Sequence, residues 1–261
     1  MRALQTAATG MAAQELNVQT ISNNIANLRT TGFKRQQAQF QDLLYENLRR
    51  AGSATSDQGT QMPAGLSIGS GVKTVSTPRD MSQGNLNSTG KPYDVAIRGE
   101  GYFKIRMPDG TAAYTRDGSF NLDAQGQLVT QNGYLVEPGI TVPQTATAVS
   151  ISNQGIVQAT LPGQTAQQNI GTIQLSRFIN KTGLNSVGDN LFTETAASGQ
   201  AVDGNPGQDG FGNLQQNYLE DANVNAVTEI SGLIAAQRAY EMNSKVIEAT
   251  DQMLQTANNV R

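Results

Sequence analysis

The sequence of 261 residues contains no cysteine, no histidine and no tryptophan. Without cysteine there is no disulfide and no thiolate, and without histidine as well there is no Ser–His–Asp triad and no ordinary zinc site. The Gly-x-Ser-x-Gly pattern at residues 65–69 therefore lacks its catalytic base. Oxygen-only calcium binding at Asp203 or Asp209 stays open, although such residues far more often form turns. We expect no catalytic residue, no cofactor and no metal.

Charge and hydrophobicity are also scarce. Charged residues make up 15% of the chain, the net charge is −3, and aromatic residues make up 5%. Such a mild charge does not favour nucleic acid or an anionic membrane as a partner. No apolar run approaches the roughly 18 residues that span a bilayer, and residues 1–10 are too polar for a secretory signal. We predict no nucleic-acid binding, no membrane insertion and, if the protein is exported, a route without a cleaved signal peptide.

At both ends of the chain, apolar residues recur every seven positions. This spacing is typical of helices that pack along a seam with other helices. Such stripes at both ends favour an assembly subunit over an enzyme. We predict that the stripe residues line interfaces between subunits as well as within one. They are Leu4, Met11, Val18, Ile21, Ile25 and Leu28 at the N-terminus, and Leu233, Tyr240, Ile247 and Leu254 at the C-terminus.

The pattern predicts one long helix at each end of the chain. The first covers about Ala3–Leu28 and ends near Gly32, a residue suited to a left-handed cap. Between Ala3 and Leu28 the only charged residue is Glu15, which is too few for a helix that faces water. The last helix starts near residues 223–225, where asparagine can cap it. The entropy lost on ordering both helices exceeds what the stripes return on burial, so we expect the ends to order on assembly.

The middle of the chain has a β pattern. Turn signals at Asp109-Gly110, Asp117-Gly118 and Asn132-Gly133 separate short apolar runs. Upstream, residues 33–50 fit either a short helix or an extended arm, and residues 51–71 fit a long loop or a hairpin. The predicted class is α+β, with terminal helices that pair and a middle of short antiparallel strands. The predicted segments are 1–32 (first helix), 33–72 (connecting arm), 73–222 (β-rich part) and 223–261 (last helix).

Several stretches resemble the bacterial flagellar rod, hook and hook-associated axial proteins. Residues 94–103 and 114–120 look like the β domain of that family, and the matches occur in the family's order along nearly the whole chain. Arg29 departs from the pattern, because many members have a small or polar residue there. The terminal motif residues that match are Asn23, Asn24, Asn27, Gly32, Phe33 and Lys34, followed by Gln237, Arg238, Tyr240 and Asn243.

Within this family the chain is most similar to distal rod members, because residues 40–72 resemble their long connecting stretch. The resemblance implies a helical homopolymer that forms a rigid, hollow drive shaft, transmits torque to the hook and conducts exported subunits. Implied partners are further copies of itself, the proximal rod and hook proteins, the surrounding ring proteins and the flagellar type III export apparatus. The implied location is the basal body, in the rod that spans the periplasm.

Other functions stay open from the sequence. They are another flagellar axial protein of the proximal rod or hook, a β-rich filament subunit such as an adhesin or phage-tail-like protein, and an enzyme that uses paired carboxylates.

Overall fold

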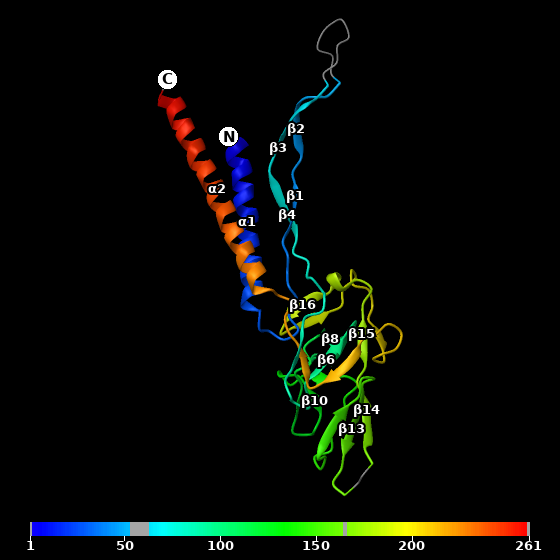
Figure 1. Ribbon diagram of the computed structural model, residues 1–261. Helices are drawn as coiled ribbons and strands as arrows, with labels where there is room; N and C mark the ends of the chain where they lie inside the picture. Colours follow the sequence, from blue (N-terminus) through cyan, green and yellow to red (C-terminus); the bar gives the residue numbers. More distant parts are fainter. Residues whose placement is uncertain (1, 53–62, 164–165, 260–261) are drawn as a thin grey trace. The chain divides into compact units, whose positions relative to one another are not determined.

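The computed structural model describes residues 2–52, 63–163 and 166–259 (Figure 1). The chain forms two compact units, each assembled from segments that are far apart in the sequence. The helical unit contains residues 1–25, 36–78 and 225–261, and the β-rich unit contains residues 26–35 and 79–224. The predicted α+β class is confirmed. The three boundaries between the four predicted segments, at residues 32, 72 and 222, remain a prediction about the assembled protein.

The helical unit contains two long helices, α1 (Arg2–Ala26) and α2 (Ala226–Asn259). Figure 1 shows them side by side, with both chain termini at the same end of the pair. The helix α1 ends two residues before the predicted Leu28, and Gly32 adopts a φ of +67° beyond it. At the start of α2 the Asn225 side-chain oxygen accepts hydrogen bonds from the amides of Val227 and Thr228, which confirms the predicted asparagine cap.

A two-stranded arm completes the helical unit. The outgoing side of the arm contains β1 (Gln39–Asp42) and β2 (Tyr45–Arg49), and the returning side contains β3 (Leu66–Gly69) and β4 (Val72–Ser76). The strand β1 pairs with β4, and β2 pairs with β3, both antiparallel. The extended alternative for residues 33–50 is therefore correct, and residues 66–69 form the returning half of a hairpin. Residues 53–62, within the predicted loop, lie outside the described residues.

The β-rich unit is built on an antiparallel sheet with the strand order β16-β17-β8-β7-β11-β10-β9, joined by β15 and β18. Smaller sheets pair β6 with β19, β5 with β20, and β13 with β12 and β14. The sheet strands are β7 (Tyr102–Arg106), β8 (Ala112–Thr115), β9 (Asn121–Leu122), β10 (Leu128–Val129), β11 (Leu135–Val136), β15 (Leu175–Arg177), β16 (Asn185–Gly188), β17 (Leu191–Thr193) and β18 (Val202–Gly204). The others are β5 (Leu86–Ser88), β6 (Val95–Arg98), β12 (Ala148–Ile151), β13 (Ile156–Thr160), β14 (Gln168–Thr172), β19 (Asn213–Gln216) and β20 (Tyr218–Glu220), with a short 3-10 helix at Lys181–Gly183.

The residues of this unit's main core come from the sequence between Val95 and Leu214, and most of them are aliphatic. Within it the rings of Phe103 and Phe120 pack edge to face, with their centroids 5.0 Å apart. Because the strands are short, this shared core stabilises them more than any single ladder does. It gives the protein a folded body that does not depend on the helices for its hydrophobic interior.

Two of the three predicted hairpin turns are confirmed. Gly110 and Gly133 both have a φ of +82°, and they join β7 to β8 and β10 to β11. The turn predicted at Asp117-Gly118 is wrong, because β8 and β9, on either side of it, do not pair with each other in the described sheet. A Cβ added to Gly118 would lie 1.7 Å from the carbonyl oxygen of Val95. This glycine is required for a close backbone crossing and not for a hairpin.

Candidate assembly surfaces

The seam between α1 and α2 consists of small and polar side chains. On α2 the buried residues Glu229, Ala236 and Thr250 are seven and fourteen positions apart, and the half-buried Asn243 fills the remaining heptad position. The seven-residue period therefore governs the seam, but small and polar residues occupy its centre. The buried residues of α1 are Ala7, Ala13, Thr20, Ile21 and Asn24.

Two glycines bring the helices close together. A Cβ added to Gly10 of α1 would lie 2.9 Å from the Asn243 side-chain nitrogen of α2. A Cβ added to Gly232 of α2 would lie 3.5 Å from the Ile21 side chain of α1. Small residues at such positions let helix backbones approach each other, and Ile21 is the large apolar side chain that packs into the space left by Gly232.

Nine of the ten predicted stripe residues lie on α1 or α2, and Leu28 lies beyond the end of α1 in the β-rich unit. Of the ten residues, Ile21 is buried, while Tyr240 and Leu254 are each 43% exposed. The remaining seven are half-buried: Leu4, Met11, Val18, Ile25, Leu28, Leu233 and Ile247. Incomplete burial leaves apolar area for a further partner, so their assignment to subunit interfaces stays a prediction.

The helix α2 also carries exposed apolar residues that are not among the ten predicted stripe residues. Val227, Ile230 and Ile234 are 78%, 49% and 47% exposed. Their spacing of three and four residues places them on one face of the helix, and this spacing was the available sequence signal. Further along, Met242 and Val246, four residues apart, are 61% and 46% exposed. Contiguous apolar faces of this kind mark interaction surfaces.

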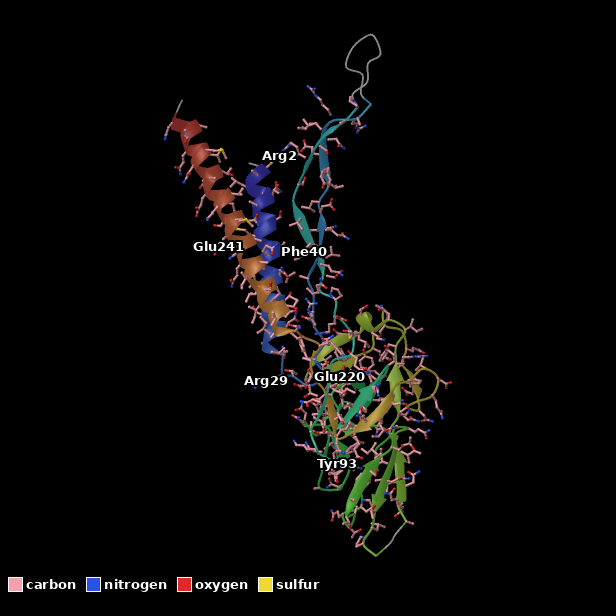
Figure 2. All side chains as sticks on the ribbon, in the orientation of Figure 1. Arg2, Arg29, Phe40, Tyr93, Glu220 and Glu241 are labelled. Carbon is pink, nitrogen blue, oxygen red and sulfur yellow. The ribbon has the colours of Figure 1, made fainter. Side chains whose placement is uncertain are left out.

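A groove runs along the helix pair beside these faces. It has a volume of about 430 Å³. Tyr240 and the predicted motif residue Gln237 border it on α2, where Glu241 is labelled in Figure 2. Its remaining lining residues on α1 are Glu15, Val18 and Gln19. The groove therefore combines two predicted stripe residues with a polar rim, a composition common at protein interfaces.

Asn24 is the polar centre of the helical unit and is completely buried. Its side-chain amide donates to the Glu229 carboxylate at 3.1 Å and to the backbone carbonyl of Gln36 at 2.8 Å, and its oxygen accepts from the Gln36 amide at 2.9 Å. One side chain thus ties α1 to the start of α2 and to the chain leading into the arm. A fully satisfied buried polar group of this kind specifies one arrangement of its neighbours.

The arm exposes apolar residues on both strands of its outer ladder. Leu48 on β2 and Leu66 and Ile68 on β3 are 50%, 52% and 41% exposed, and Leu44, just before β2, is 88% exposed. Arg2 of α1, labelled in Figure 2, forms an ion pair with Glu46 of β2, and the Thr9 hydroxyl accepts from the Val72 amide at 3.4 Å. An isolated two-stranded ribbon is only marginally stable in water, so these apolar residues are a second candidate assembly surface.

The motif residue Lys34 lies inside the β-rich unit, where it is 2% exposed. Its ammonium donates to the Glu220 carboxylate at 2.5 Å and to the Ser82 carbonyl at 2.7 Å. The Arg116 guanidinium forms an ion pair with the other Glu220 oxygen at 2.8 Å, and the Gly84 amide donates to Glu220 at 2.9 Å. Glu220, labelled in Figure 2, has no exposed surface. The buried group therefore contains two cations and one carboxylate.

Two pKa values reflect this environment. Burial lowers the pKa of the Lys34 ammonium below its usual 10.5, and the Glu220 carboxylate opposes that effect. Nearby, hydrogen bonds from Ser82 hold the pKa of the Asp80 carboxyl below its usual 3.8. The Lys34 ammonium and the Asp80 carboxylate are both hydrogen-bonded to Ser82, the first to its carbonyl and the second to its amide.

The other motif residues serve the two units differently. The Gly32 amide donates to the Glu220 carbonyl at 2.7 Å. A glycine is required at this position because φ is +67° and an added Cβ would lie 2.9 Å from the backbone nitrogen of Asp117. Phe33, Asn27 and Asn243 are half-buried, whereas Asn23, Gln237 and Arg238 are exposed. Glu220 was not predicted from the sequence, because it lies outside the motifs that carry the family resemblance. Arg116 lies within one of those motifs, but its neighbours Thr115 and Asp117 are polar and give no sign that its charge is buried.

Among the described residues, no group of three or more acidic side chains is placed to hold a metal ion. In the same part of the chain, no helix has both the length and the apolar character needed to cross a membrane.

Comparison with known proteins covers both ends and the middle of the chain. Residues 4–34 match the flagella basal body rod protein family, residues 96–159 the flagellar hook protein FlgE/F/G D1 domain, and residues 215–260 the flagellar basal body rod FlgEFG protein C-terminal domain. Flagellar basal-body rod protein FlgG of Caulobacter vibrioides is 57% identical over 261 residues, covering 100% of both chains. FlgG of Borreliella burgdorferi is 48% identical and FlgG of Bacillus subtilis 36% identical, each covering 100% of this chain and 99% of the relative.

Terminal helices that pair, a β-rich middle and three flagellar domain matches in order define a structural subunit of the flagellar axis, a class without enzymatic activity. The chain belongs to the family of the flagellar basal-body rod protein FlgG, the distal rod protein. Its location is accordingly the flagellar basal body, and it takes part in the axial assembly of rod and hook components.

Proposed function

We propose that this rod subunit polymerises helically through its terminal helices into a rigid, hollow shaft that transmits torque to the hook and conducts exported subunits. The observation that carries the proposal is the apolar face of Val227, Ile230 and Ile234 on α2, outside the seam with α1. Since α1 does not cover this face, we assign it to helices of neighbouring copies. Repetition of one non-closing contact generates a helical polymer.

The predicted interface residues fit this arrangement. Their partial exposure, as for Tyr240 and Leu254, leaves each helix with apolar area on more than one side. We propose that the ten stripe residues serve both the seam and the contacts between subunits. The arm residues Leu44 and Leu48 would then contact a neighbouring copy and stiffen the shaft.

We further propose that the subunit contacts the proximal rod proteins at one end of the shaft, the hook protein at the other and the ring proteins around it. Its place would be the part of the rod that spans the periplasm. We also propose that the subunit is delivered by the flagellar type III export apparatus without a cleaved signal peptide, a route suggested by its membership of the rod family.

A double substitution on α2 tests the polymerisation mechanism. Ile230→Ser with Ile234→Ser removes two apolar side chains that lie outside the seam, so the helix pair should keep its circular dichroism. Each isoleucine contributes about 1.5–3 kcal/mol when fully buried. We expect the concentration needed to form straight tubes in negative-stain images to rise at least about tenfold.

The matched control is Ile179→Ser, which replaces a 91% exposed isoleucine of the β-rich unit. This variant should form tubes at the concentration of the unmodified protein. Unchanged assembly of the α2 double variant would show that this face is not an interface, and the proposed polymerisation mechanism would be abandoned.

A further inference from the structure

Three backbone segments of the β-rich unit meet in a closed ring of hydrogen bonds. The Arg35 amide donates to the Asn223 side-chain oxygen at 2.7 Å. The Asn223 side-chain nitrogen donates to the Asp80 carbonyl at 2.8 Å, and the Asp80 amide donates to the Arg35 carbonyl at 2.8 Å. Each residue thus contacts both of the others, although they are far apart in the sequence.

The ring lies where the chain passes between its two units. The chain leaves the β-rich unit after residue 35, returns at residue 79 and leaves again after residue 224. Arg35, Asp80 and Asn223 are therefore within two residues of three of the four crossings. A single ring fixes these three crossing points on the surface of the β-rich unit.

The ring adjoins the buried group of Lys34, Arg116 and Glu220, because the Lys34 ammonium and the Asn223 side-chain nitrogen both donate to the Ser82 carbonyl. Glu220 accepts from Lys34 of the first segment and from the Gly84 amide of the second, and it belongs to the third segment itself. Arg116 also donates to the carbonyl oxygens of Gly99 and Gly101 at 2.8 and 2.7 Å, which anchors the group to the β core. Like the Asn223 side chain in the ring, the carboxylate of Glu220 therefore joins all three segments, and it does so in the buried interior.

We propose that Glu220 closes a clamp, formed by residues 32–35, 80–84 and 220–223, that opens and closes as one piece on an otherwise folded β-rich unit. Glu220 is a positioning residue in this clamp, since it acts by holding Lys34 and the backbone around it. The core cluster runs from Val95 to Leu214, outside all three segments, so loss of the clamp leaves that core in place. Regions with separate packing of this kind open separately in native proteins.

Charge balance distinguishes the possible variants. Glu220→Gln leaves two buried cations facing an amide, and an uncompensated buried charge is strongly destabilising. Lys34→Met leaves Arg116 and Glu220 as a balanced pair and replaces the ammonium by an apolar group of similar length. The same clamp should therefore tolerate loss of Lys34 far better than loss of Glu220.

Hydrogen exchange of the dilute full-length chain, followed by mass spectrometry, tests the proposal. The reporters are the Gly32 and Arg35 amides, with β7 and β8 as the internal reference. We expect Glu220→Gln to raise exchange at both reporters at least about a hundredfold, and Lys34→Met to raise it about tenfold or less. The double variant Lys34→Met with Glu220→Gln should exchange more slowly at both reporters than Glu220→Gln alone, because it has one unpaired buried cation fewer.

Arg106→Gln is the control, because it breaks the exposed ion pair with Glu137 in the same unit. It should leave both reporters unchanged. Equal loss of protection at β7 and β8 in Glu220→Gln would overturn the proposal, because the clamp would then be inseparable from the core. Protected reporters in Glu220→Gln, or no recovery in the double variant, would overturn it as well, since Glu220 would not hold the segments through Lys34.

Discussion

Gly118 shows how strictly a single position of the β-rich unit is determined. A Cβ there would meet a backbone oxygen at 1.7 Å, and a backbone atom cannot rotate away as a flexible side chain can. We expect Gly118→Ala to lower the free energy of unfolding by about 3 kcal/mol or more, measured by urea denaturation. Gly110→Ala is the control, because its site is open and costs only left-handed backbone strain of about 1–2 kcal/mol. Equal losses in the two variants would contradict this steric account.

Asp117, the neighbouring residue, provides a prediction on pH. Burial raises the pKa of this carboxyl above its usual 3.8, despite hydrogen bonds from Ser119. The folded protein therefore binds the Asp117 proton more tightly than the unfolded chain does. The resulting stabilisation is fully present below pH 3.8 and is lost as the pH rises through the raised pKa.

Asp117→Asn removes this titration and keeps the side-chain oxygen that accepts from the Ser119 amide. We expect the variant to gain stability relative to the unmodified protein between pH 3 and pH 7, measured from urea denaturation at each pH. Asp109→Asn is the comparison, because hydrogen bonds from Thr111 lower the pKa of Asp109 and give the opposite sign. A stability difference for Asp117→Asn that does not change with pH would refute the prediction.

At the scale of elements, the small residues of the helix seam are the feature to test. Ala236 is 3% exposed in the seam, whereas the adjacent Ala235 is exposed. We expect Ala236→Leu to overpack the seam and cost about 1–3 kcal/mol, seen as earlier loss of helical circular dichroism on heating. Ala235→Leu carries the same change on an exposed position and should melt as the unmodified protein does. A stable Ala236→Leu helix pair would mean that the seam is loosely packed.

Local sequence patterns were sufficient to predict the helices and most of the turns. The two long helices, the Asn225 cap and the turns at Gly110 and Gly133 were predictable, because each depends on residues close together in the chain. The hairpin turn predicted at Gly118 is wrong, because this glycine is required by the backbone of Val95, which lies more than twenty positions away in the sequence. Local patterns cannot distinguish a glycine needed for a turn from one needed for a crossing.

The residues at the centre of each unit were harder to predict for the same reason. The heptad spacing correctly predicted the helix pair. Because Leu233 and Tyr240 are apolar, they were predicted as the stripe of α2, whereas Ala236 and Asn243 lie in its seam with α1. Glu220 has no helical or strand periodicity that marks it, since its partners come from three other parts of the chain. Family motifs named Lys34 without explaining it, and the buried carboxylate supplies the reason for its charge.

At the scale of the whole molecule, we expect both termini to gain protection on assembly. In the single chain, α2 exposes apolar residues such as Val227 and Met253, which polymerisation would cover. Limited proteolysis should therefore cut within residues 2–26 and 226–259 of the dilute protein and spare them in tubes. The β7–β8 region is the internal standard and should resist in both states. Termini that are already resistant in the dilute monomer would contradict coupled ordering and assembly.

Each unit takes its parts from both the beginning and the end of the chain. Lys34 finds its carboxylate only when residue 220 is present, and Asn24 finds Glu229 only when α2 has begun. A chain that stops before residue 220 therefore completes neither unit, and a chain that stops between residues 224 and 229 completes only the β-rich unit. Because such fragments leave Lys34 or Asn24 without a buried partner, we expect only chains that extend into α2 to complete the helical unit.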